Sequence, residues 1–114
     1  MPTLYRLWVG GGQAAGWQYL QFGGRYDWYY FNESGLMHTG WLDYNGSRYY
    51  LNPVSDGWKG AMFTGWHLIE GKWYCFETVP GRDQGHMYVN TTTPDGYRCG
   101  ADGAWDGRPA GSVG

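Results

Sequence analysis

Hydrophobic residues alternate with polar ones in short runs, and pairs ending in glycine separate the runs. Aromatic-rich runs lie at residues 28–31, 48–51 and 73–76. A Gly-Trp pair precedes each run, at 16–17, 40–41 and 65–66, and a turn pair lies between, at 23–24, 45–46 and 70–71. Such runs flanking an X-Gly pair are typical of β-hairpins. No helical periodicity is present, so the pattern predicts an all-β fold.

The hairpins recur at a fixed step along the chain. Glycines 35, 60 and 85 are spaced 25 residues apart, as are methionines 37, 62 and 87. A fixed period in the range of 20 to 50 residues indicates stacked units that bury one another's hydrophobic faces. We therefore predict a β-solenoid of stacked β-hairpin repeats in a single domain, 1–114. Its segments are a preceding strand or cap at 1–14, repeats at 15–39, 40–64 and 65–95, a degenerate terminal repeat at 96–107 and a tail at 108–114.

The second strand of each hairpin has two different faces. Because strand side chains alternate, Tyr29 shares a face with Phe31, and the later repeats copy this pattern with Tyr49, Leu51, Tyr74 and Phe76. This uniform face is predicted to pack. The opposite face varies between repeats, so we expect a ligand there, at the joints between hairpins.

Composition excludes several classes of function. The net charge is −2 with 8 Lys plus Arg, so the positive field that nucleic acid requires is missing. No apolar run is long enough to span a membrane, and residues 1–12 lack the features of a signal peptide. The two cysteines, Cys75 and Cys99, leave a disulfide and a pair of buried thiols both open.

Catalytic and metal chemistry have little support. The three glutamates fall at turns or strand ends, where a paired-carboxylate hydrolase would not place them. The three histidines are His38, His67 and His86, and they show no ligand spacing. We therefore expect no enzyme activity, no metal site and no cofactor.

The repeated phrase resembles a known family over about residues 15–107. Gly-Trp, a turn glycine, Trp-Tyr-Tyr-Phe and Gly-X-Met-X-Thr-Gly-Trp are similar to the choline-binding or cell-wall-binding repeats of Gram-positive surface proteins. Glucan-binding and clostridial toxin repeats are similar too. The resemblance implies a left-handed hairpin solenoid that is non-catalytic and binds choline-bearing teichoic acid or a cell-wall glycan. It also implies that the chain is a module of a larger protein, secreted or attached to the cell wall.

The resemblance also implies where ligands bind. At the first joint the family's aromatic positions fall on Trp17, Trp28 and Tyr44, with Met37 as an apolar floor. A quaternary ammonium has no N–H to donate, so aromatic faces are the natural way to hold it. The first joint is therefore the predicted ligand site.

The other two joints are incomplete in sequence. At the second, Trp41 is followed by Arg48 and Ile69 where aromatic residues are expected, so we predict that this site does not bind a cation. At the third, Trp66 and Trp73 are present but the closing position falls on Gly100. A second, partial site there requires Tyr97 or Trp105 as a substitute.

Two alternatives stay open at the level of sequence. One is a glucan- or carbohydrate-binding module, since Trp faces also stack on sugars. The other is a structural stalk whose ligand sites have been lost. Exposed end strands also make a homodimer through terminal hairpins plausible.

Overall fold

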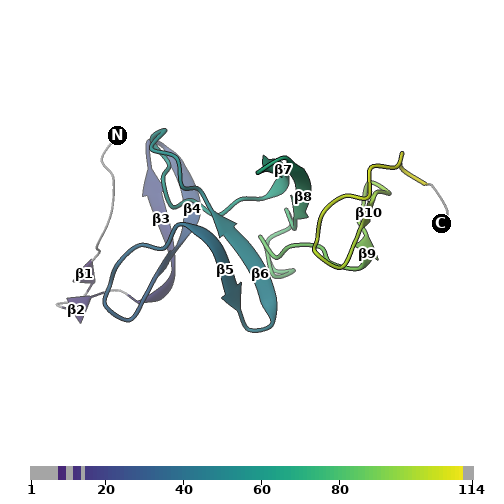
Figure 1. Ribbon diagram of the computed structural model, residues 1–114. Coiled ribbons are helices and arrows are strands. Elements are labelled where there is room, and N and C mark those ends of the chain that lie inside the picture. The colour runs from purple at the N-terminus through teal and green to yellow at the C-terminus, as the bar shows by residue number, and fades with distance from the viewer. Residues whose placement is uncertain (1–7, 10–11, 14, 112–114) are drawn as a thin grey trace. The chain divides into compact units, whose positions relative to one another are not determined.

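The computed structural model describes residues 8–9, 12–13 and 15–111. Of the predicted preceding strand or cap at 1–14, residues 1–7, 10–11 and 14 lie outside the described residues. The chain divides into two units, Met1–Phe63 (unit 1) and Thr64–Gly114 (unit 2), and each is described by itself (Figure 1). All regular secondary structure in the described residues is β-strand, which confirms the predicted all-β class.

Every strand pairs with its neighbour in sequence as an antiparallel two-stranded sheet. In unit 1, β1 (Trp8–Val9) pairs with β2 (Gly12–Gln13), β3 (Gly16–Phe22) with β4 (Arg25–Phe31), and β5 (Gly40–Tyr44) with β6 (Ser47–Leu51). In unit 2, β7 (Gly65–Ile69) pairs with β8 (Lys72–Phe76), and β9 (Thr91–Thr92) with β10 (Arg98–Cys99). The hairpins predicted for the three full repeats are therefore present.

The hairpin turns have the backbone that their sequences predict. Asn45 and Gly46 have φ of 49° and 80°, and Glu70 and Gly71 have φ of 50° and 85°. Positive φ at both central residues matches the right-handed twist of the flanking strands. These turns fix the register, which sets Trp41 opposite Tyr50 in β5–β6.

The linker that follows each hairpin also repeats. The N–H of Gly60 donates to the carbonyl of Asn52 at 2.7 Å, and the equivalent bonds are Gly35 to Asn32, Gly85 to Glu77 and Gly103 to Gly100. Two residues later the linker forms an antiparallel bridge with the end of its own hairpin, through Met37, Met62, Met87 and Trp105. Trp105 therefore occupies the methionine position in the last repeat.

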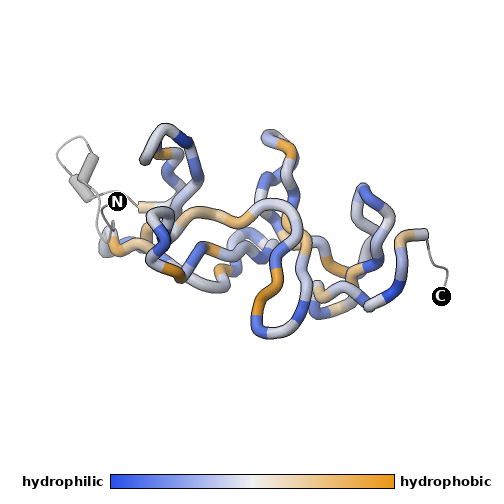
Figure 2. The backbone as a smooth tube through the Cα atoms, turned by 90° about the horizontal axis from the view of Figure 1, so that it is seen from above, coloured by the Kyte–Doolittle hydropathy of each residue, from blue (hydrophilic) through white to orange (hydrophobic). Residues whose placement is uncertain are grey.

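The predicted packing face forms the core of unit 1. Tyr29 is 2% exposed and Phe31 is 0% exposed, and they form one cluster with Ala61. Tyr49 and Leu51 form a second cluster with Met62. Figure 2 shows the matching sequence pattern, in which hydrophobic and hydrophilic residues alternate in short steps along the backbone.

In unit 2 burial extends to both faces of β8. Phe76 is fully buried as predicted, but Cys75, on the face expected to be variable, is also buried. Cys75 lies opposite Trp66 in the register. Cys75 and Cys99 are both free thiols.

The last hairpin begins earlier than the sequence phrase indicates. The predicted start at Gly96 lies in the turn between β9 and β10, whereas Asn90 occupies the position of the repeat glycine, 25 residues after Gly65. Asn90 has a φ of 52°, a left-handed conformation that Asn tolerates better than most residues. Thr91 then stands where the earlier repeats carry Trp, so this repeat lacks the Gly-Trp signature.

Candidate functional site: two aromatic clusters

Unit 1 brings together the three aromatic residues predicted for the first joint. The ring of Trp17 lies 6.5 Å from that of Trp28 and 6.0 Å from that of Tyr44, with interplanar angles of 86° and 88°. It also contacts Tyr30 at 5.3 Å and Tyr49 at 5.1 Å. Nearly perpendicular rings are the favoured geometry for aromatic pairs, and they form walls rather than stacks. We call this group the Trp17 cluster.

The methionine next to these rings is Met62. Trp17, Trp28 and Tyr44 pack against the core group that contains Met62, whereas Met37 packs against the other group, with Tyr29 and Phe31. A Cβ on Gly60 would lie 2.4 Å from the sulfur of Met37, so Met37 fills the space beneath that glycine. Met37 thus packs with one core cluster of unit 1, and the other three predicted site residues pack with the second cluster.

Trp41, at the second joint, is covered by an arginine from its own hairpin. The guanidinium of Arg48 lies 5.6 Å from the centre of the Trp41 ring and forms an ion pair with Asp43 at 2.8 Å. Arg48 lies opposite Asp43 in the register, so the hairpin itself holds the cation over the ring. The pair also lowers the pKa of Asp43, chiefly through the hydrogen bond from Arg48. The other residue predicted for this joint, Ile69, is buried in unit 2.

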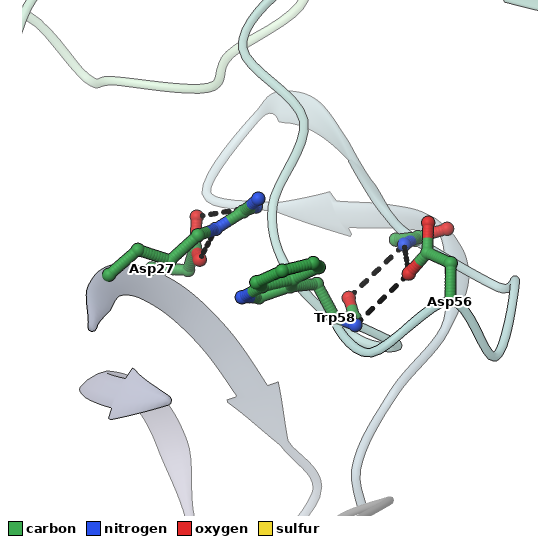
Figure 3. A network of polar contacts seen from close by, with 5 residues as sticks. Asp27, Asp56 and Trp58 are labelled. Carbon is green, nitrogen blue, oxygen red and sulfur yellow. Dashed lines mark hydrogen bonds and ion pairs between the residues drawn. The ribbon is translucent and has the colours of Figure 1, made fainter. Parts of the chain in front are cut away.

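A second arginine covers a tryptophan in the insertion at residues 53–58. The guanidinium of Arg25 lies 4.4 Å from the centre of the Trp58 ring and pairs with the carboxylate of Asp27 (Figure 3). The loop is held by Asp56, which accepts hydrogen bonds from the side chain of Asn52 and the backbone N–H of Trp58, both at 3.0 Å. The Trp58 face is thus occupied by the protein's own cation.

Unit 2 contains an open cavity of about 330 Å³ between its two hairpins. Its lining residues are Trp66, Trp73, Asp95, Tyr97 and Trp105. The structure therefore brings together all three residues predicted for the partial site, Trp66, Trp73 and Tyr97. It adds Trp105, the alternative substitute, and Asp95, which the sequence indicates only as part of an Asp-Gly turn.

The rings of this cavity are held at right angles. Tyr97 lies 5.7 Å from Trp66 and 5.9 Å from Trp105, at interplanar angles of 85° and 88°. The indole N–H of Trp105 donates to the carbonyl of Arg108 at 2.8 Å, which orients the ring. Trp73 is 43% exposed, and its carbonyl accepts the backbone N–H of Trp105 at 2.8 Å. This backbone hydrogen bond joins β8 to the linker that follows β10.

Asp95 is the acidic member of the cavity lining. Its carboxylate accepts the indole N–H of Trp66 at 2.9 Å and also accepts a hydrogen bond from the hydroxyl of Thr93. These bonds, with Thr93 making the larger contribution, hold the pKa of Asp95 below its ordinary value. The carboxylate is therefore ionised at neutral pH. In sequence, Asp95-Gly96 has the pattern of a turn, so only the folded chain reveals that it faces three indoles.

Two other titratable groups of unit 2, Cys75 and Glu77, have shifted pKa values. Burial raises the pKa of Cys75 to about 12, which makes its thiol a poor nucleophile. Burial opposes ionisation of Glu77, but hydrogen bonds from Val79, Tyr88 and Thr78 outweigh it and lower the pKa.

Among the described residues, no group of His, Cys, Asp and Glu side chains is arranged to hold a metal ion. The same described residues include no helix long and apolar enough to cross a membrane.

Comparisons with known proteins agree with this geometry. Residues 14–59 match one family model described as a choline-binding repeat, and residues 81–105 match another of the same description. Choline binding protein F of Streptococcus pneumoniae is 41% identical, with a TM-score of 0.65, over 84% of this chain and 28% of that one. A pneumococcal cell wall endolysin from phage Cp-1, complexed with choline, is 25% identical, with a TM-score of 0.52, over 95% of this chain and 39% of that one.

One relative is covered almost completely. The choline binding domain of the Streptococcus pneumoniae protein Spr1274 is 41% identical, with a TM-score of 0.60, over 81% of this chain and 94% of that one. A search of curated protein sequences finds no match. The chain spans less than a third of the length of choline binding protein F. With two repeat models and this domain matched, the chain belongs to the choline-binding repeat family.

Proposed function

We propose that this chain is a non-catalytic cell-wall-binding module that holds choline groups of teichoic acid in its aromatic sites. The observation that carries the proposal is the unit 2 cavity, where Trp66, Trp73, Tyr97 and Trp105 surround a space of about 330 Å³. A trimethylammonium group needs apolar contact and the negative faces of aromatic rings, and this lining offers both. The choline bound to the related phage endolysin supports the same chemistry.

The expected strength of one site is modest. Each ring contributes about 0.5 to 2 kcal/mol to binding a cation, so three or four rings give a total near the ~4 kcal/mol of a millimolar site. The Trp17 cluster supplies a second set of rings in unit 1. On a polymer that carries many choline groups, two weak sites gain avidity of about 10² or more. Weak single sites are therefore compatible with firm attachment.

The module's role follows from its size and family. Because it spans less than a third of choline binding protein F, we infer that it tethers a larger secreted or cell-wall-attached protein, and that any catalysis belongs to other modules. We further infer that its hairpins stack as a left-handed solenoid, which small-angle X-ray scattering would test against a compact globule. A homodimer through terminal hairpins stays a prediction, to be tested by sedimentation.

A calorimetric titration tests the binding function. Choline is added to the wild-type chain and to a double variant, Trp28→Ala with Trp73→Ala, which removes one ring from each aromatic site. Leu68→Ala is the matched control, because Leu68 lies opposite Trp73 in the register, is 57% exposed and does not line the cavity.

We expect millimolar choline binding by the wild type and by Leu68→Ala, and at least a tenfold weaker affinity for the double variant. The same titration with glucose and with N-acetylglucosamine separates choline from glycan recognition. No heat from choline with the wild-type chain would overturn the proposal. Binding of the sugars alone would replace choline with a glycan ligand, and binding of neither would leave a structural stalk.

A further inference from the structure

We infer that Asp95 makes the unit 2 cavity a charge-paired site, which selects a cationic ligand over a neutral one of the same shape. This inference rests on the proposed function and names what decides specificity in one of its two sites. Aromatic ring faces and a carboxylate both favour a trimethylammonium group over a neutral tert-butyl group of the same shape. The ring faces do so through their quadrupoles, and a fixed carboxylate in the lining adds the attraction of a full negative charge for the cation.

The carboxylate is fixed by the site itself. The indole of Trp66 donates to one oxygen of Asp95 at 2.9 Å, and the hydroxyl of Thr93 donates to the other. The tight turn between β9 and β10 therefore delivers the charge to the same ring that forms a wall of the cavity. Both bonds favour the ionised form of the carboxylate, which the lowered pKa of Asp95 reflects.

No protein cation neutralises this carboxylate in the part of the chain that the structure describes. Ion pairs there join Arg25 to Asp27, Arg48 to Asp43, and Lys72 to Asp102. The other residues that line the cavity are three tryptophans and a tyrosine. The cavity thus offers negative charge and aromatic faces together, with no internal cation against them.

The same chain shows what such a combination holds. The ring of Trp58 is covered by Arg25, which pairs with Asp27, and the ring of Trp41 is covered by Arg48, which pairs with Asp43. Both places combine an aromatic face, a carboxylate and a guanidinium from the protein. The unit 2 cavity has an aromatic face and a carboxylate, and it leaves space for a cation, which an external ligand supplies.

The two aromatic sites should therefore differ in selectivity. In the Trp17 cluster the four rings in contact with Trp17 belong to tryptophan and tyrosine, so we expect shape and ring faces to decide its ligand. In the unit 2 cavity the negative charge of Asp95 acts in addition to shape and ring faces. We expect Asp95 to improve choline affinity about tenfold, which corresponds to ~1.4 kcal/mol at 25 °C.

The test compares choline with 3,3-dimethyl-1-butanol (dimethylbutanol), the neutral analogue in which a carbon atom replaces the quaternary nitrogen. Both are titrated calorimetrically into the full chain carrying Trp28→Ala, so that the unit 2 cavity dominates the signal. Asp95→Asn is then added to this background, because the amide oxygen can still accept the Trp66 bond while the charge is lost. Asp83→Asn is the matched control, since Asp83 is exposed, lies outside the cavity lining and has a φ of 52° that Asn also tolerates.

We expect Asp95→Asn to weaken choline binding about tenfold and to leave dimethylbutanol binding unchanged, while Asp83→Asn alters neither. Equal choline affinity with and without Asp95→Asn overturns the inference, as does equal affinity of the parent for the two ligands. Circular dichroism of each variant checks that the fold is retained. If the unchanged chain binds no choline, the proposed function fails; if choline binds regardless of Asp95, only this inference fails.

Discussion

The Trp17 cluster in unit 1 and the cavity in unit 2 use the same residue types in different ways. Trp17 contacts four other rings within 6.5 Å, and three residues of its cluster pack directly on the core of unit 1. In unit 2, three indoles and Tyr97 surround an open cavity with a carboxylate at its wall. At the joint that is complete in sequence one indole, that of Trp17, contacts four other rings, whereas Tyr97 of the cavity contacts two.

A full set of aromatic positions therefore does not measure how much ring surface a ligand can reach. Ring faces that contact other rings stabilise the hairpins, and only the faces left over can bind. In the last repeat, Thr91 replaces the usual Trp and Trp105 replaces the usual Met, so one indole is lost at one position and gained at another. The degenerate repeat thereby completes the cavity.

The largest effect should come from removing one fully buried ring from the core of each unit. Phe31 in β4 and Phe76 in β8 are both 0% exposed, so Phe31→Ala and Phe76→Ala should each lower the free energy of unfolding by about 3–5 kcal/mol. Urea denaturation followed by tryptophan emission measures this. Leu68→Ala, at a 57% exposed position, should change it by less than about 0.5 kcal/mol. A loss below about 1 kcal/mol for either phenylalanine would show that its unit lacks the core described here.

Thiol chemistry probes unit 2 without altering the sequence. Because burial raises the pKa of Cys75 to about 12, its thiolate is scarce at pH 8, and Ellman's reagent should label it about 10³-fold more slowly than an ordinary thiol. Cys99, which is 0% exposed, should be protected as well. Absorbance at the thionitrobenzoate band follows the reaction, with the urea-unfolded chain as control. Labelling within about tenfold of the unfolded rate would mean that the hairpins of unit 2 open readily.

Alanine variants of Gly71 and Gly103 separate the cost of a left-handed backbone from the cost of crowding a neighbouring side chain. Gly71 and Gly103 have φ of 85° and 83°, but only at Gly103 would a Cβ meet a neighbour, the Cε of buried Met87 at 2.3 Å. Gly71→Ala should cost about 1–2 kcal/mol through its left-handed backbone, and Gly103→Ala about 1–3 kcal/mol more. Thermal melts of the two variants compare them. Equal melting temperatures would contradict the packing of Met87 beneath the last linker.

The smallest effect should come from uncovering Trp41. Arg48 and Asp43 form an exposed ion pair, so Arg48→Ala should change the free energy of unfolding by less than about 1 kcal/mol. The same change removes the cation above the Trp41 ring and should increase quenching of tryptophan emission by acrylamide. Arg82→Ala is the control, at an exposed position in unit 2. Unchanged quenching would mean that Arg48 does not cover the ring in solution.

The hairpins were predictable from sequence because their signals are local. X-Gly pairs predicted the turns, and the alternation of side chains along each strand predicted the buried face. The structure confirms that face, because it buries Tyr29, Phe31, Tyr49, Leu51 and Phe76. The start of the last hairpin was harder to predict. Asn90 adopts the left-handed backbone of a repeat glycine without being one, and only counting 25 residues from Gly65 could have found it.

The site residues were partly predictable, for a physical reason. Trp17, Trp28 and Tyr44 meet because each holds a fixed place in its own hairpin, and a family pattern records such places. The other contacts depend on packing between segments that are distant in sequence. Met37 packs with the core cluster of Tyr29 and Phe31 next to Gly60, and Asp95 comes from the turn between β9 and β10, which looks ordinary in sequence. No local pattern specifies such contacts.

We expect open ring faces to bind the cation and ring faces already covered by arginine to stay unoccupied. The most direct measurement is a choline titration of the ¹⁵N-labelled chain, following the indole N–H signals of its tryptophans. The signals of Trp66, Trp73 and Trp105 should shift together and saturate, while those of Trp41 and Trp58 stay in place. Shifts of Trp41 and Trp58 equal to those of the cavity tryptophans, or no shift of the cavity tryptophans at all, would contradict this expectation.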